Sequence, residues 1–112
     1  MLELNKVHHG DCLALLKSMP ENTVDLIVTS PPYADRRKNT YGGVAVDQYW
    51  EWFKPIALEM KRVLKPSGSM FINIKPHCDK GERLLYVYEL VIKMRNDCGL
   101  RLVEEFTWTK NG

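Results

Sequence analysis

The chain has 112 residues, 45% of them hydrophobic, which suits one modest domain and gives no support for a second. Sixteen Lys and Arg against fourteen Asp and Glu give a net charge of +2, so overall charge does not predict nucleic-acid binding. The three cysteines are widely spaced, which indicates free thiols rather than a disulfide framework. Because no apolar run approaches a membrane span and no signal peptide is evident, we expect a cytoplasmic protein without a membrane partner.

The first third of the chain predicts a strand, a helix and a second strand. Residues 4–8 are a short strand candidate, and Asp11 is placed to cap a helix that ends before Pro20. Residues 24–29 are apolar apart from Asp25. Such a run is typical of a strand that is buried on both faces of a parallel sheet.

A loop over residues 34–46 is expected to lead into a long helix capped by Asp47. Pro55 lies inside the helical pattern and predicts a kink or a split. Apolar residues at helical spacing predict one buried face. This face comprises Tyr49, Trp52, Phe53, Ile56, Met60, Val63 and Leu64, and the tryptophans and Tyr49 are interpreted as helix core and flank rather than a base-stacking platform.

Residues 65–68 predict a turn and residues 69–74 a third strand, followed by a loop through His77 to Gly81. A second long helix is expected over about residues 82–97, ended by Gly99. Its predicted buried residues are Leu84, Tyr88, Val91 and Met94, with the stem of Arg95 as an alternative to Met94. Residues 100–108 predict a last strand. This alternation of strands and helices favours an α/β fold with a parallel sheet.

The most distinctive segment is the run Thr29-Ser30-Pro31-Pro32-Tyr33. Each proline fixes φ near −65° and removes an amide donor, so the pair ends the preceding strand in a stiff turn. Open α/β sheets bind ligands at the carboxyl ends of their strands. A hydroxyl, a free carbonyl and an aromatic ring at that place suit a flat base that carries an amino group.

Three segments together carry a family resemblance: Gly10-Asp11-Cys12, residues 24–33 (VDLIVTSPPY) and residues 62–68 (RVLKPSG). In this order the chain, from about Val7 to Asn111, resembles the amino-methylating DNA methyltransferases, which move a methyl group from S-adenosylmethionine to an exocyclic base nitrogen. It is similar to the subgroup whose catalytic motif precedes the cofactor glycine loop. The resemblance implies a partial Rossmann-like methyltransferase domain and double-stranded DNA as a partner.

The resemblance also implies the roles of the residues in the turn. An exocyclic amine is a poor nucleophile because its lone pair is delocalised into the ring. The Ser30 hydroxyl and the Pro31 carbonyl would accept its N–H bonds, and Tyr33 would stack on the extruded base. With Pro32, which stiffens the turn, these are the predicted catalytic residues. No covalent intermediate is needed.

The identity of residue 30 bears on the target base. In this family, Ser before Pro-Pro is the commoner pattern among cytosine-N4 enzymes, whereas adenine-N6 enzymes usually carry Asp or Asn. We therefore favour cytosine-N4, with adenine-N6 as the alternative, because a hydroxyl and a carboxylate both accept from an amine. A related Asn-Pro-Pro-Tyr turn serves methylation of protein glutamine or RNA, and Ser30 argues against that class.

Two further groups of residues have open readings. The resemblance places Asp11 and Cys12 near the adenine of S-adenosylmethionine, although Asp11 is equally a plain helix cap. Arg36, Arg37 and Lys38 follow the turn and suit DNA phosphate contacts, although a short charge run is often only a solvated loop. We predict no metal site, because the histidines and cysteines lack the paired spacing of a zinc module.

The chain lacks the Phe-x-Gly-x-Gly type loop with which the family binds the methionine part of its cofactor. The resemblance therefore implies that residues 1–112 form a single incomplete catalytic domain, the N-terminal part of a methyltransferase, without two strands of the cofactor-binding half. We expect exposed strand edges that favour a homo-oligomer or a missing C-terminal half. The alternative is a catalytically silent remnant, or half of a split enzyme, that acts as a binding module.

Overall fold

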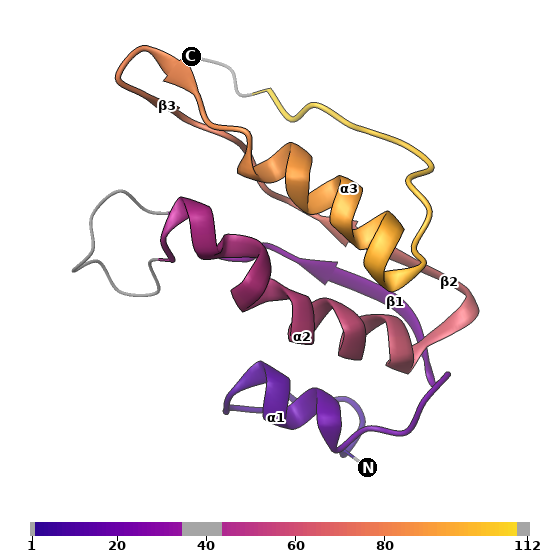
Figure 1. The fold of residues 1–112 in the computed structure, drawn as a ribbon. Coiled ribbons are helices and arrows are strands. Elements are labelled where there is room, and N and C mark those ends of the chain that lie inside the picture. The colour runs from indigo at the N-terminus through magenta and orange to yellow at the C-terminus, as the bar shows by residue number, and fades with distance from the viewer. Residues whose placement is uncertain (1, 35–43, 110–112) are drawn as a thin grey trace.

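The computed structural model describes residues 2–34 and 44–109. Its main elements are α1 (Cys12–Lys17), β1 (Val24–Thr29), η1 (Val46–Gln48), α2 (Tyr49–Val63), β2 (Leu64–Ile72), β3 (Cys78–Asp79), β4 (Glu82–Arg83) and α3 (Tyr86–Cys98). In Figure 1, α2 and α3 lie side by side in front of the sheet formed by β1 and β2. The arrangement is the expected partial α/β fold, with parallel strands and helices packed against them.

The two central strands pair in parallel, from Leu26 opposite Ser69 to Thr29 opposite Ile72. At their start the register shifts, because Val24 lies opposite Leu64 and residues 65–68 bulge out between the paired positions. The predicted turn at 65–68 thus lies inside β2, which ends at Ile72 instead of residue 74. A Cβ atom on Gly68 would lie 2.7 Å from a Leu64 methyl, so a larger residue in the bulge would force the Leu64 side chain to shift.

Only one face of this sheet is covered in the described part of the chain. Ile27, Met70 and Ile72 pack against the helices. On the other face Leu26, Val28 and Phe71 are 55%, 69% and 48% exposed. The prediction that residues 24–29 are buried on both faces is therefore wrong for these residues, because α2 and α3 lie on the same side.

The helix cap predicted at Asp11 is confirmed, since its Oδ2 accepts a hydrogen bond from the Ala14 N–H at 3.0 Å. The strand predicted over residues 4–8 is wrong. Asn5 adopts a left-handed conformation with φ 61°, and the segment forms a turn instead. A strand this short has no stability without a neighbour to pair with, and the described residues offer it none.

Helix α2 differs from its prediction at two points. Asp47 lies inside the short 3₁₀ turn η1, and Gln48 is the N-cap without a side-chain bond, so Asp47 is not the cap. The helix is continuous from Tyr49 to Val63 with Pro55 inside it, so it is not split. Its buried face outweighs the hydrogen bond that a proline removes.

The second long helix begins later than expected. A small hairpin of β3 and β4 occupies part of the predicted loop and helix, and turns at Lys80 and Gly81, which both have positive φ. Helix α3 ends at Gly99 with φ 75°, as predicted. Its buried residues are Tyr86, Val87, Leu90, Met94 and Cys98. Tyr88, predicted as buried, is exposed, because the face that meets α2 follows a different phase of the helix.

The last predicted strand, over residues 100–108, is wrong. Residues 100–109 are assigned to no strand and follow an extended path past α3, drawn in yellow in Figure 1. Leu102 and Phe106 are largely exposed. Alternating apolar residues make a strand only where a neighbouring strand pairs with them.

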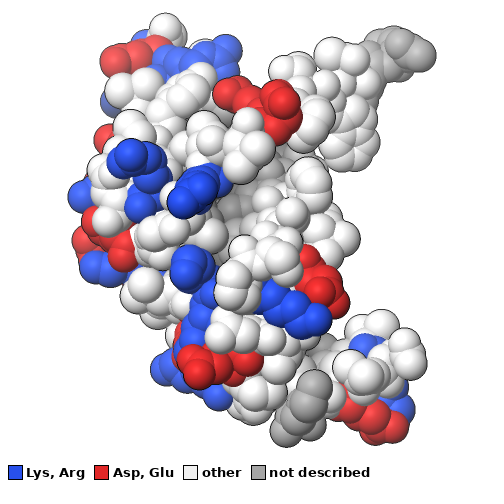
Figure 2. Space-filling model, turned by 90° about the vertical axis from the view of Figure 1, so that its right-hand side faces the viewer, with Lys and Arg blue, Asp and Glu red and all other residues white. Residues whose placement is uncertain are grey.

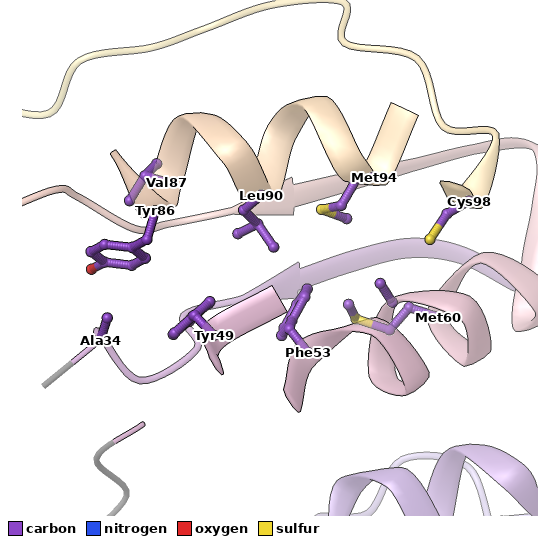
Figure 3. Packing of buried hydrophobic residues seen from close by; sticks show 10 residues of the cluster. Ala34, Tyr49, Phe53, Met60, Tyr86, Val87, Leu90, Met94 and Cys98 are labelled. Carbon is purple, nitrogen blue, oxygen red and sulfur yellow. The ribbon is translucent and has the colours of Figure 1, made fainter. Parts of the chain in front are cut away.

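The core lies between α2 and α3 (Figure 3). It comprises Ala34, Tyr49, Phe53, Ala57, Met60, Tyr86, Val87, Leu90, Met94 and Cys98. At one end Tyr49 and Tyr86 lie next to Ala34, and at the other end Met60 lies near Cys98. Within residues 2–34 and 44–109, no helix is long and apolar enough to cross a membrane.

Candidate active site

The turn of residues 30–33 leaves the sheet at the carboxyl end of β1. The Asn73 N–H donates to the Thr29 carbonyl at 2.9 Å, so the pairing with the β2 side persists up to the residue before Ser30. Ser30 is exposed, Pro31 is buried, and Tyr33 is 45% exposed. The structure therefore presents the predicted hydroxyl and aromatic ring to solvent while the first proline anchors the turn in the protein.

Tyr49 holds this turn from the first residue of α2. Its hydroxyl donates a hydrogen bond of 2.5 Å to the Pro32 carbonyl, across 17 residues of sequence. Tyr49 is only 1% exposed. Burial, and secondarily the neighbouring Tyr86, raise the pKa of Tyr49 far above its ordinary value of 10.0, so the phenol stays protonated and remains a donor.

Tyr86 lies beside Tyr49, with ring centroids 5.0 Å apart, at the start of α3. Its hydroxyl donates to the Lys75 carbonyl at 3.0 Å, in the segment that follows β2. Burial raises the pKa of Tyr86, a hydrogen bond with the Ala34 backbone lowers it, and the nearby Tyr33 raises it. Tyr86 thus contacts the segments that leave both central strands.

Asp11 and Cys12 lie at the start of α1, and both are exposed. One carboxylate oxygen of Asp11 accepts a hydrogen bond from the Ala14 N–H. A carboxylate has a second oxygen, so the cap is compatible with a further bond from an adenine amino group. The contact of these two residues with the cofactor stays a prediction.

Arg62, near the end of α2, fixes the position of α1. Its Nη2 donates to the carbonyls of Leu16 and Met19 at 2.9 and 2.8 Å. Its Nε pairs with the Glu59 carboxylate. A charged donor that satisfies two carbonyls at the end of a helix both caps and anchors it. Arg62 therefore ties the segment that carries Asp11 to the central helix.

The predicted DNA-contacting residues Arg36, Arg37 and Lys38 lie outside the described residues. On the face turned to the viewer in Figure 2, Lys and Arg side chains are interspersed with Asp and Glu. In the described part of the chain, no group of three or more His, Cys, Asp or Glu residues is placed to hold a metal ion.

Sequence reasoning missed the roles of Tyr49, Tyr86 and Arg62. The helical pattern assigns Tyr49 to the core and flank of the helix and gives no role to Tyr86. A usable signal exists in the residue type: a buried tyrosine still needs a partner for its hydroxyl, so a tyrosine at the start of a helix on its buried face indicates a bond to a neighbouring loop.

Comparison with known proteins finds a matching family and several similar relatives. Residues 24–112 match the family model described as DNA methylase, N6_N4_Mtase. The type II methyltransferase M.PvuII of Proteus hauseri is 37% identical over 101 residues, covering 88% of this chain and 30% of the relative. The DNA adenine methyltransferase YhdJ of Escherichia coli K12 is 41% identical over 73 residues, covering 62% of this chain and 24% of the relative.

Among solved structures, the PvuII DNA methyltransferase, described as cytosine-N4-specific, matches with a TM-score of 0.68 and 36% identity. The match covers 80% of this chain and 33% of that one. The chain belongs to the DNA methylase family, as its motifs predicted. It spans about a third or less of the length of these relatives.

Proposed function

We propose that residues 1–112 are the catalytic part of a DNA methyltransferase that transfers a methyl group from S-adenosylmethionine to N4 of a cytosine extruded from duplex DNA. One observation carries the proposal: a stiff Ser30-Pro31-Pro32-Tyr33 turn at the carboxyl end of β1, in a member of the DNA methylase family. The cytosine-N4 specificity stated for the similar PvuII structure favours cytosine.

The turn supplies the hydrogen-bond acceptors that methyl transfer to an exocyclic amine requires. The Ser30 hydroxyl and the Pro31 carbonyl accept the two N–H bonds of the target amine and free its lone pair. The cofactor supplies an electrophilic methyl group on a sulfonium. As the nitrogen–carbon bond forms, the carbon–sulfur bond breaks and the nitrogen loses one proton to solvent. Because the prolines hold the acceptors in place, little reorganisation is needed, and Tyr33 stacks on the base.

Adenine-N6 is the second candidate. The adenine methyltransferase YhdJ is 41% identical over the segment it shares with this chain. Adenine and cytosine both present an exocyclic amine, and a serine hydroxyl accepts from either. The product nucleoside separates the two targets.

The chain by itself is proposed to transfer no methyl group. Its 112 residues hold no cofactor glycine loop, and Asp11 and Cys12 offer one edge of an S-adenosylmethionine site. Arg36, Arg37 and Lys38 are proposed to contact DNA phosphates and to position the duplex without reading its sequence. The alternative is a silent binding module or half of a split enzyme.

A chimera tests the catalytic proposal. This chain replaces the segment of M.PvuII that it matches, and the protein is incubated with duplex DNA and labelled S-adenosylmethionine. We expect N4-methylcytosine in the nucleoside digest by mass spectrometry, and no labelled nucleoside from the 112-residue chain alone. M.PvuII itself is the positive control.

Each outcome has a definite meaning. N6-methyladenine as the only product would overturn the choice of base. A folded chimera that binds DNA and cofactor but gives neither product would contradict the catalytic role and favour the binding module. Turnover by the 112-residue chain alone would refute its proposed dependence on a further segment.

The open sheet face predicts self-association of the isolated chain. Leu26, Val28 and Phe71 form an exposed apolar strip, and β1 and β2 each pair along one edge within the described residues. Open strand edges beside apolar surface favour pairing between chains. We expect a dimer or larger species in sedimentation velocity.

A charged substitution identifies the surface responsible. Val28→Lys places a cation in the strip and is expected to shift the chain toward monomer, whereas Leu58→Lys, at an exposed position of α2, should leave association unchanged. A strictly monomeric parent chain would rule out the oligomer and leave a further segment of polypeptide as the proposed cover.

A further inference from the structure

We propose that Tyr49 is a positioning residue that locks the Ser30–Tyr33 turn so that the Pro31 carbonyl faces the target amine. Tyr86 supports Tyr49 in this role. This inference rests on the proposed function for its catalytic consequence. The two tyrosines come from different helices, α2 and α3, and meet at the end of the core next to Ala34 (Figure 3).

The first step of the argument concerns the backbone of the turn. Pro31 and Pro32 have no N–H, so neither can hold the turn by an amide hydrogen bond of its own. Carbonyls are the polar groups left to these two residues. The Tyr49 hydroxyl donates a hydrogen bond to the Pro32 carbonyl, and this bond fixes the orientation of the peptide plane that follows Pro32.

The second step concerns the direction of the neighbouring carbonyl. Proline restricts the residue before it to extended conformations, and its own φ is fixed. The remaining soft torsion between the plane after Pro32 and the plane that carries the Pro31 carbonyl is ψ of Pro32, and the bond from Tyr49 to the Pro32 carbonyl restrains it. A hydrogen bond to the Pro32 carbonyl therefore sets the direction in which the Pro31 carbonyl points.

The third step concerns rigidity. Tyr49 is buried and packs edge-on against Trp52, with ring centroids 5.5 Å apart, and stacks with Phe53 at 6.2 Å. Its ring has no room to move without disturbing the core. Tyr86 donates to the Lys75 carbonyl and packs in the core next to Ala34, so the exits from β1 and β2 are held together. The turn is thus fixed to the sheet and to both helices.

Nuclear magnetic resonance on the 112-residue chain tests the lock directly. Tyr49→Phe keeps the ring and removes the hydroxyl, and the carbonyl carbon of Pro32 should shift upfield because a hydrogen-bonded carbonyl resonates further downfield. p-Aminophenylalanine at position 49 restores an N–H donor and should return the shift toward the parent value. An unchanged Pro32 signal in Tyr49→Phe would overturn the proposal.

Two variants separate positioning from stability. Met94→Ala leaves a cavity at a buried α3 position away from the turn, and should destabilise the chain without moving the Pro32 signal. Tyr88→Phe removes an exposed hydroxyl from the same helix and should change neither the stability of the chain nor the Pro32 signal. A Pro32 shift in Met94→Ala as large as that in Tyr49→Phe would reduce the tyrosine to a structural role and refute the proposal.

The catalytic consequence is measured in the chimera with M.PvuII. Tyr49→Phe should lower kcat about 10-fold with little change in KM for DNA, because a displaced Pro31 carbonyl impairs the alignment of the target amine more than the binding of DNA. Met94→Ala should leave kcat per folded protein unchanged. An unchanged kcat in Tyr49→Phe contradicts the positioning role. An inactive parent chimera contradicts the proposed function instead. In that case the Pro32 signal alone tests whether Tyr49 holds the turn.

Discussion

Ser30→Ala in the chimera with M.PvuII is expected to lower kcat for methyl transfer about 100- to 1000-fold, the range measured when one preorganised hydrogen-bonding group is removed from an active site. The hydroxyl is exposed at the carboxyl end of β1 and is the proposed side-chain acceptor for the amine. Alanine keeps the backbone of the turn, so the Pro31 carbonyl and the Tyr49 bond remain. Single-turnover kinetics with saturating DNA and cofactor measure the chemical step.

Ser67→Ala is the matched control. Ser67 is exposed in the bulge between the paired positions of β2, away from the carboxyl ends of the strands. We expect its kcat to equal that of the parent. If Ser30→Ala retains kcat within a factor of about three, a free-energy effect near 0.7 kcal/mol, the hydroxyl is not an acceptor in the transition state.

Phe53→Ala is expected to have the largest effect on stability, a loss of about 3–5 kcal/mol in the free energy of unfolding. Phe53 is 2% exposed and lies between α2 and α3 in the centre of the core. A domain of this size has only about 5–15 kcal/mol in total. Urea denaturation followed by circular dichroism at fixed protein concentration measures the change.

Phe71→Ala serves as the comparison, because it removes the same ring from the open face of β2. Phe71 is only partly covered, so the expected cost is about 1 kcal/mol or less. An equal cost for the two variants would mean that another surface covers Phe71 in solution, in agreement with self-association. A cost below about 1 kcal/mol for Phe53→Ala would contradict its place in the core.

Much of the fold follows from local sequence. Residues 24–29 form β1 with the predicted bounds, because a run of β-branched and apolar residues is ended by two prolines. The cap at Asp11 and the left-handed Gly99 after α3 were likewise predictable. In each case the physical cause lies within a few residues of the position itself.

The failed strand predictions concern partners distant in sequence. Residues 4–8 and 100–108 have strand-like composition, yet a strand exists only when a second strand accepts its hydrogen bonds. The exposed face of β1 has the same origin. An apolar run indicates that burial is favourable and does not say which element covers each face.

The candidate site divides in the same way. The stiff Ser30–Tyr33 turn and family membership follow from the sequence alone, because proline stereochemistry and motif order are properties of the chain. The packing of the helices, in contrast, is what brings Tyr49 and Tyr86 to that turn and Arg62 to α1. These bonds join residues 11 to 46 positions apart, so they depend on how the helices pack against the sheet.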